Sequence, residues 1–244
     1  MQTLNLKVTE LIELSPTSKA IRLGLKGKKF DYQPGQFVTF ELDLTATGKF
    51  KVLEGKPSTQ KRRFSLSSLP SNPYLEVTVR KTDDGFVSDY LVNYSTLGEE
   101  IAVKGPYGHF FLDEKNSKKN IFLIGMGSGI CPLISILRYI KEKELPIQVH
   151  YLCSARFENE IIWRKEIESL PSENITYEFT ITREEPKNWK GSLGRINKDL
   201  ISKNLKDPKN TEFYLCGSPE FVENITSILK ELKIPKENIK KEAY

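Results

Sequence analysis

The stretch that decides the fold is IFLIGMGSGICPL, residues 121–133. Its first four residues are apolar and typical of a buried strand. Gly125, Gly127 and Gly129 follow at once, and Pro132 then starts a segment with helical spacing. Bare backbone at such a strand-to-helix turn lets a pyrophosphate approach the N–H groups of the helix N-terminus. The turn therefore predicts a dinucleotide site; the alternative is a tight turn that holds no ligand.

Towards the C-terminus, apolar strands alternate with amphipathic helices. Strands are expected at residues 147–152, 176–182, 212–216 and 239–242. Apolar residues at helical spacing mark three helices, with the sets Leu133, Ile136, Leu137, Ile140, then Trp163, Ile167, Leu170, then Phe221, Ile225, Ile228, Leu229. This alternation predicts an α/β domain with a doubly wound parallel sheet over residues 116–244.

Towards the N-terminus, the pattern has period two instead. Short alternating stretches near residues 4–8, 21–25, 37–40, 64–66, 75–79 and 101–103 are separated by Gly, Pro and Asn. They predict an antiparallel six-stranded β-barrel over residues 1–115. The polar segment 43–61 is expected to be a long exposed loop, and residues 113–120 a linker.

Composition and charge narrow the class of protein. The chain has 244 residues, of which 38% are hydrophobic and 28% charged, enough for two domains with their own cores. A net charge of +5 suits an acidic protein partner or phosphate-bearing ligands better than nucleic acid. Cys131, Cys153 and Cys216 are too scattered for a disulfide framework, a zinc site or an iron–sulfur centre. His109 and His150 are too far apart in sequence to indicate a metal pair.

No targeting segment is visible in the sequence. The first ten residues alternate polar and apolar side chains, unlike a secretory signal. Residues 121–140 are apolar enough to suggest a membrane span, but glycines, Pro132 and Arg138 interrupt them. We therefore expect a cytoplasmic protein without a membrane span.

Six motifs resemble, in the same order, those of the ferredoxin–NADP reductase superfamily. They are RRFS (62–65), GFVSDYL (85–91), GPYG (105–108), GSGICP (127–132), CGSP (216–219) and EAY (242–244). The resemblance spans nearly the whole chain. It implies a barrel that binds FAD, followed by an α/β domain that binds NADP or NAD.

On the barrel, the resemblance implies a site for the FAD diphosphate. Arg62 would pair with the phosphates through its guanidinium, while Ser88 and the N–H groups after Gly85 would hold them at a short helix start. The alternative for Arg62 is a solvated charge on a strand. Val79 and Val87 complete the implied cofactor-binding set on the barrel.

The flavin ring would lie beside the end of the RRFS motif. Phe64 departs from the family tyrosine: it can lie against the isoalloxazine, but it cannot donate a phenolic hydrogen bond, so weaker FAD retention is expected. Ser65 matches the family serine beside the hydride-accepting nitrogen, where a hydroxyl can both donate and accept. Core packing for Phe64 and a backbone hydrogen bond for Ser65 are the alternatives.

On the α/β domain, the resemblance implies the nicotinamide side of the site. Cys216 would be a small polarizable wall beside the nicotinamide, Glu242 would orient that ring or relay protons, and Tyr244 would act as a movable lid on the flavin. An inert buried cysteine and a frayed terminus are the alternatives. The implied coenzyme set adds Gly127, Ser128, Gly129, Pro132 and Gly217, and the implied catalytic set is Ser65, Cys216, Glu242 and Tyr244.

The segments around Arg156, Thr182-Arg183 and Arg195 resemble those that surround the extra phosphate of NADPH in bacterial members of the family. Cations that converge on one dianion would favour NADPH. The alternative is that these arginines serve NADH equally, because WKG (189–191) resembles a segment of NADH-using oxygenase reductases.

The resemblance implies an FAD-dependent NADPH reductase that exchanges single electrons with an acidic carrier such as ferredoxin or flavodoxin. The Lys-rich region 49–63 is a candidate docking surface. Two alternatives stay open: an NADH-linked reductase component of an oxygenase or other redox complex, and a non-catalytic flavin-binding subunit.

Overall fold

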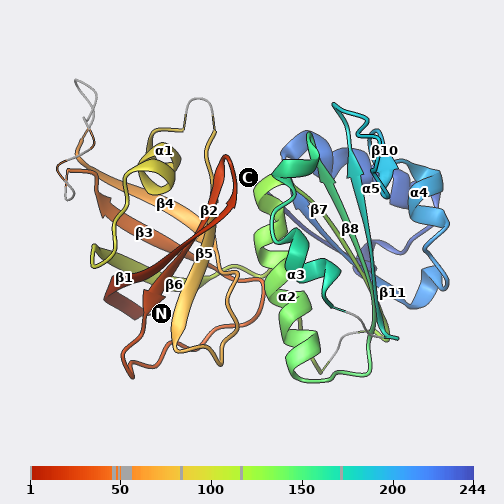
Figure 1. Ribbon diagram of the computed structural model, residues 1–244. Helices are drawn as coiled ribbons and strands as arrows, with labels where there is room; N and C mark the ends of the chain where they lie inside the picture. Colours follow the sequence, from red (N-terminus) through yellow and green to blue (C-terminus); the bar gives the residue numbers. More distant parts are fainter. Residues whose placement is uncertain are drawn as a thin grey trace. The chain divides into compact units, whose positions relative to one another are not determined.

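The computed structural model describes residues 2–45, 48, 50, 57–82, 85–115, 118–170 and 173–244. The chain divides into two compact units, Met1–Phe111 and Leu112–Tyr244 (Figure 1). From the sequence, the boundary was expected after residue 115.

The first unit is an antiparallel barrel, which confirms the predicted fold class. Its strands are β1 (Gln2–Ser15), β2 (Ser18–Gly24), β3 (Phe37–Asp43), β4 (Thr59–Ser65), β5 (Tyr74–Arg80) and β6 (Glu100–Tyr107). They are ordered β4-β3-β6-β1-β2-β5, and every pair is antiparallel. An isolated bridge between Leu66 and Val77 joins the two edges of this sheet, so the strands curl into a barrel.

The barrel core follows from the period of two. On β3 the alternate residues Val38, Phe40 and Leu42 are at most 1% exposed. The short helix α1 (Phe86–Asn93) packs Val87, Tyr90 and Leu91 into the same core. The helix therefore lies against the barrel, and its N-terminus is held in place by buried side chains.

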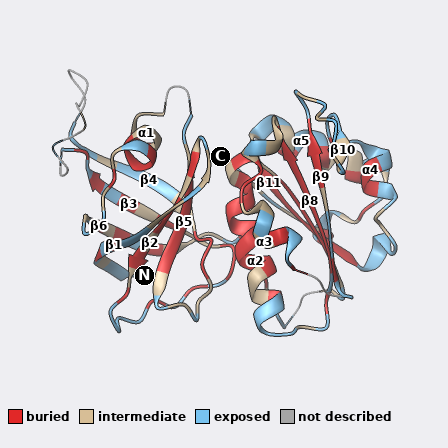
Figure 2. Ribbon diagram, in the orientation of Figure 1, coloured by how far each residue is buried: buried red, intermediate tan, exposed pale blue. Residues whose placement is uncertain are grey.

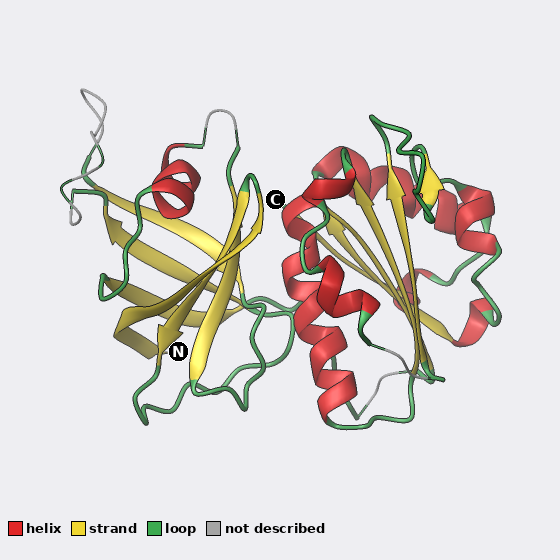
Figure 3. Ribbon diagram, in the orientation of Figure 1, coloured by secondary structure: helices red, strands yellow, loops and turns green. Residues whose placement is uncertain are grey.

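The second unit is a parallel sheet with helices on both faces, as predicted (Figure 3). Its strands are β7 (Asn120–Met126), β8 (Gln148–Ala155), β9 (Ile175–Ile181), β10 (Ser192–Leu193), β11 (Thr211–Gly217) and β12 (Ile239–Ala243). Their order is β10-β9-β8-β7-β11-β12, and all neighbours are parallel. The helices are α2 (Ile130–Glu142), α3 (Arg164–Glu168), α4 (Lys198–Ser202) and α5 (Pro219–Glu231). Figure 2 shows the central strands buried along nearly their whole length, which is typical of a sheet covered on both faces.

Three local expectations were wrong or incomplete. The predicted helix with Trp163, Ile167 and Leu170 is only Arg164–Glu168, because Trp163 has a left-handed backbone at φ 60. The short elements β10 and α4 were not predicted. The segment 43–61 is not a wholly exposed loop. Leu44 is fully buried, and its N–H donates to the carbonyl of Ser58 at 3.0 Å, so the β3–β4 hairpin continues into the segment.

Among the described residues, none of the helices combines the length and the apolar character needed to cross a bilayer.

Candidate functional site

The glycine turn lies at the point where the sheet reverses its order of strands. From β7 the chain adds β8, β9 and β10 on one side, then returns to place β11 and β12 on the other. Ligands of open α/β sheets bind at the carboxyl ends of the strands beside such a reversal. Here those ends are Met126 on β7 and Gly217 on β11, so the turn Gly127–Gly129 stands where a dinucleotide is expected.

The backbone is packed too closely at this turn for side chains. A Cβ on Gly129 would lie 2.2 Å from the carbonyl oxygen of Cys216 and 2.8 Å from the nitrogen of Gly217. Gly127 has a left-handed backbone at φ 55, which also favours glycine. The turn is therefore a backbone cradle at the N-terminus of α2, and this fits the phosphates of a dinucleotide.

Tyr244 bonds to this cradle through its hydroxyl. That hydroxyl accepts from the N–H of Gly129 at 3.0 Å and donates to the carbonyl of Met126 at 2.9 Å. The residue as a whole is 58% exposed, but burial of the hydroxyl raises the pKa of Tyr244 to about 12. The phenol stays protonated at neutral pH and occupies one of the N–H groups of the cradle.

Cys216 and Glu242 are neighbours on β11 and β12, where they are partners in register. Cys216 is buried, and burial raises the pKa of its thiol well above the usual range, with Glu242 adding to the effect. Burial also raises the pKa of Glu242. The thiol is neutral and a poor nucleophile, so it can border a ligand site without reacting. The carboxyl beside it can hold a proton.

The arginines predicted for the extra phosphate stand at the ends of adjacent strands. Arg156 follows β8, and its carbonyl accepts from the N–H of Arg183 after β9 at 2.9 Å. Arg195 follows β10, whose Leu193 pairs with Ile181. The three arginines therefore lie at the same edge of the sheet, where the carboxyl ends of β8, β9 and β10 meet.

Two of these arginines contact carboxylates. Arg156 pairs with Glu160 at 3.3 Å, and Arg195 with Glu220 at 3.5 Å. Thr182, the remaining predicted residue, is exposed and donates through its hydroxyl to the carbonyl of Ala155 at 3.3 Å.

On the barrel, the predicted FAD residues of β4 lie on two faces. Arg62 and Phe64 are in register with the core residues Phe40 and Val38, whereas Ser65 is on the opposite face. The Phe64 and Phe40 rings are 5.0 Å apart. The guanidinium of Arg62 is exposed and donates to the carbonyl of Lys61 at 2.8 Å; within the described residues it forms no ion pair. It is therefore available to an anion.

The start of α1 is the second half of the predicted phosphate site. A Cβ on Gly85 would lie 2.1 Å from the hydroxyls of both Ser88 and Thr82, which would then have to rotate away. The Ser88 hydroxyl donates to the Gly85 carbonyl at 2.9 Å. Among the residues that the structure describes, no side chain caps the N–H groups of this helix, which fits a phosphate there. Val79 and Val87 are each 2% exposed and pack in the core, so any contact of theirs with a cofactor would come from the backbone.

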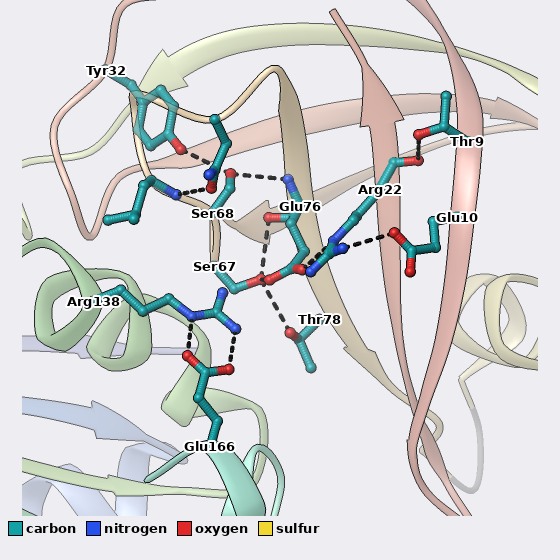
Figure 4. Close-up of polar contacts among 12 residues, drawn as sticks. Thr9, Glu10, Arg22, Tyr32, Ser67, Ser68, Glu76, Thr78, Arg138 and Glu166 are labelled. Carbon is teal, nitrogen blue, oxygen red and sulfur yellow. Dashed lines mark hydrogen bonds and ion pairs between the residues drawn. The ribbon is translucent and has the colours of Figure 1, made fainter. Parts of the chain in front are cut away.

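Sequence reasoning missed a buried polar network that supports the end of β4 (Figure 4). Glu76 is 0% exposed and accepts from Arg22 at 2.8 Å and from the Ser67 hydroxyl at 2.9 Å. The Ser68 hydroxyl accepts from the Glu76 N–H at 2.9 Å and contacts the Tyr32 hydroxyl at 2.8 Å. These contacts fix the segment that directly follows Ser65.

Gln36 was also missed. Its side-chain amide donates to the carbonyl of Gly108 at 3.0 Å, and the neighbouring Phe37 packs against Tyr107 in a tilted arrangement with ring centres 5.7 Å apart. The GPYG motif is thereby fixed beside β3. The signal in the sequence was Gly35, directly before Gln36. In the structure its φ of 105 marks a tight turn at this position.

The two histidines lie apart from these sites. His109 is exposed. His150 is 9% exposed, contacts the Thr176 hydroxyl at 2.8 Å, and packs edge-on against Phe122. In the part of the chain that the structure describes, His, Cys, Asp and Glu side chains form no group of three or more that could hold a metal ion.

Comparison with known proteins matches this architecture. A family model for the oxidoreductase FAD-binding domain matches residues 5–112, and one for the oxidoreductase NAD-binding domain matches residues 123–227. The glycine betaine monooxygenase reductase subunit of Chromohalobacter salexigens is 29% identical over 208 residues, which are 82% of this chain and 53% of that protein. Flavohemoprotein A of Dictyostelium discoideum is 29% identical over 222 residues, or 87% of this chain and 52% of that protein. The chain thus spans about half the length of these relatives.

Solved structures show the same fold over the full chain. The flavohem-like FAD/NAD binding domain of nitric oxide dioxygenase from Vibrio cholerae O1 biovar El Tor has a TM-score of 0.84 at 23% identity and covers 98% of each chain. A ferredoxin NADP+ reductase from Neisseria gonorrhoeae, with bound FAD and NADP, has a TM-score of 0.80 at 20% identity and covers 100% of this chain and 99% of that one. With one family model on the barrel and the other on the parallel sheet, the chain belongs to the ferredoxin–NADP reductase superfamily of FAD- and NAD(P)-binding oxidoreductases.

Proposed function

We propose that this chain catalyses hydride exchange between NAD(P)H and FAD and passes single electrons to a redox protein. The observation that carries this proposal is the backbone cradle of Gly129 against Cys216 and Gly217, with Glu242 in register beside the thiol. FAD, when bound, would supply the conversion between two-electron and one-electron transfer. The protein contributes binding, orientation and control of protons.

In the barrel unit, Arg62 and the start of α1 would hold the FAD diphosphate. The guanidinium is exposed, and the N–H groups at the start of α1, which no described side chain caps, offer donors. The hydroxyl of Ser65 can donate or accept, so it suits a flavin nitrogen that gains and loses a proton. Phe64 can contact the ring only through its apolar faces.

In the α/β unit, the cradle would hold the coenzyme pyrophosphate. The neutral thiol of Cys216 would limit where the nicotinamide can lie, and the carboxyl of Glu242 would orient it or hold a proton. Tyr244 must release the N–H of Gly129 before a phosphate can bind there. The last residue therefore competes with the coenzyme for the same donor.

The proposal predicts a yellow protein that is reduced by NAD(P)H and reoxidised by a one-electron carrier. The test is to load the purified protein with FAD, reduce it with coenzyme under anaerobic conditions, and offer ferredoxin, flavodoxin or an oxygenase component in turn. A protein that is colourless and fails to take up FAD would instead indicate a non-catalytic subunit.

An NADH-linked reductase component of an oxygenase is the second candidate. It is favoured by the similarity to a monooxygenase reductase subunit. Steady-state preference for NADH over NADPH, together with faster electron transfer to an oxygenase component than to ferredoxin, would support it.

Docking of an acidic carrier is proposed for the Lys-rich region 49–63. Lys61 is exposed and pairs with Glu41 at 3.1 Å, and Arg62 and Arg63 are exposed beside it. Lys56, like all of residues 51–56, lies outside the described residues. Charge reversal at Lys56 and Lys61 should weaken the salt dependence of carrier reduction, and an unaltered salt dependence would reject this docking surface.

A further inference from the structure

Arg156, one of the arginines at the carboxyl ends of β8–β10 (here called the coenzyme edge), forms an ion pair with a carboxylate. The Nε and Nη2 atoms of Arg156 each lie 3.3 Å from an oxygen of Glu160. The Glu160 side chain is only 9% exposed, against 41% for Arg156. The carboxylate is thus the more confined partner, and Arg156 would have to leave it to reach a ligand in solvent.

The turn that carries Glu160 is held by further polar contacts. It spans Glu158–Glu160, and the N–H of Glu158 donates to the carboxylate of Glu184. The carboxylate of Glu158 pairs with Arg164 at 2.5 Å. Both contacts hold in place the turn that positions Glu160 beside Arg156.

The charge balance at this edge differs from that expected from the sequence. The guanidiniums of Arg156 and Arg195 face carboxylates, and the Arg195 pair is more than 80% exposed, so solvent screens it. A 2′-phosphate that approaches Arg156 meets the confined negative charge of Glu160, which opposes its binding. A ribose with a free 2′-hydroxyl carries no such charge and avoids this repulsion.

We propose that Glu160 is a specificity-determining residue that lowers the affinity for 2′-phosphorylated coenzyme relative to NADH. It does so by holding Arg156 in an ion pair and by placing a negative charge where the phosphate would bind. This inference rests on the proposed function only in that the ends of β8 and β9 must hold the adenosine ribose.

The test compares two ligands that differ only in the 2′-phosphate, 2′,5′-ADP and 5′-AMP, by calorimetric titration of the FAD-loaded protein. Glu160→Gln removes the charge and keeps the shape. It should tighten binding of 2′,5′-ADP by about tenfold, the effect of one charge-assisted hydrogen bond, and leave 5′-AMP unchanged. The ratio of kcat/KM for NADPH to that for NADH should rise by the same factor. Glu160→Ala should show the same gain in affinity, and it replaces Glu160→Gln in the test if that variant folds poorly.

Glu168→Gln is the matched control, because Glu168 pairs with Arg164 at the same spacing of four residues but away from the predicted phosphate arginines. It should change the affinity for neither 2′,5′-ADP nor 5′-AMP. In the Arg156→Ala background the gain from Glu160→Gln should shrink, because only the relief of direct repulsion remains, and an undiminished gain would overturn the role of the ion pair. No gain in either Glu160 variant would overturn the inference itself. If the wild-type protein binds neither ligand, the proposed function fails at this site instead.

Discussion

At the scale of single residues, Glu242 is a carboxyl whose protonation the fold favours. Burial raises its pKa above the usual value, so the folded state prefers the neutral acid, and stability is lost as the pH rises through the folded pKa. Glu242→Gln should therefore raise the melting temperature at pH 8, with the difference disappearing at pH values well below the unfolded pKa of about 4.3. Differential scanning calorimetry across this range measures it.

The matched control is Glu223→Gln on the exposed face of α5. It should leave the melting temperature unchanged at every pH. An equal rise in both variants would show that removal of any acidic charge stabilises this protein, and the special role of Glu242 would be lost.

The Tyr244 hydroxyl bonds to the Gly129 N–H, which we propose the coenzyme uses, so removing this hydroxyl should favour the coenzyme. Tyr244→Phe keeps the ring but deletes the hydrogen bond, and the dissociation constant for NAD(P)+ should fall roughly three- to tenfold, as expected for one net hydrogen bond. Fluorescence titration measures the change. Tyr177→Phe, on another part-exposed tyrosine, should have no effect. Weaker binding in Tyr244→Phe would mean that the hydroxyl supports the coenzyme rather than competing with it.

Which site residues could be predicted from sequence depended on whether their constraint is local. Gly127 and Gly129 could be predicted because a strand-to-helix turn needs their missing side chains. Glu76 could not, since its partner Arg22 stands on another strand and the middle of β5 resembles any alternating segment. Glu160 was also missed, because ion pairing with Arg156 depends on the turn between them.

At the scale of elements, the close approach of α2 to β11 should make Gly129 intolerant of any side chain. Its backbone is right-handed at φ −62, so alanine costs nothing in conformation, and the clash with the Cys216 carbonyl is the whole effect. Gly129→Ala should destabilise the α/β unit by about 3 kcal/mol, the upper range for overpacking, and abolish coenzyme binding.

Gly27→Ala provides the comparison in denaturant unfolding. Gly27 has φ 79 and open space around it, so only backbone strain applies, and the loss should be about 1 kcal/mol. If Gly129→Ala proves no more harmful than Gly27→Ala, the turn and β11 are not packed as closely as described.

Strand β8 contains a histidine that should make the protein sensitive to acid. Burial lowers the pKa of His150 from 6.5 to about 4, opposed by Glu178. The folded state favours the neutral imidazole. Its contribution to the stability of the fold is therefore present above pH 6.5 and is lost as the pH falls through the folded pKa. The loss amounts to about 3 kcal/mol in full.

His150→Gln should flatten this fall in stability between pH 7 and pH 4.5, as measured by urea unfolding at each pH. The exposed His109 provides the control, and His109→Gln should keep the wild-type profile. Parallel profiles for wild type and His150→Gln would show that this ring does not titrate as argued.

Long periodic elements were predictable and short ones were not. The stripes on α2 and α5 repeat over several turns, and both helices are present. The stripe at 163–170 is too short to prove a helix, and the left-handed Trp163 stacks on Arg138, with the guanidinium 4.3 Å from the ring centre. Strand β10 has two residues, too few for any period, and its place depends on pairing with Thr180 and Ile181.

At the scale of the whole molecule, the two predicted cofactor sites belong to separate compact units. Arg62 lies in the first and the glycine cradle in the second, so each site should be separable by mutation. Arg62→Ala should weaken FAD retention roughly 10- to 100-fold through loss of charged hydrogen bonds, yet leave the affinity of the apoprotein for 5′-AMP unchanged. Calorimetry with each ligand tests this. Loss of both affinities would mean that Arg62 stabilises the fold rather than holding phosphate.

The positions of most strands along the chain, the change from antiparallel barrel to parallel sheet and the family could be predicted from the sequence, because period and motif order extend over the chain. The distribution of charge at the coenzyme edge could not, because it depends on which carboxylate meets each arginine.

The most direct test of the central claim is anaerobic rapid mixing of the FAD-loaded protein with NADH or NADPH, each with and without deuterium at the transferred position of the nicotinamide. The account predicts bleaching of the visible flavin band, slowed by deuterium because the hydride itself moves in that step. A band that stays unchanged with both coenzymes, in a protein that holds FAD, would contradict it.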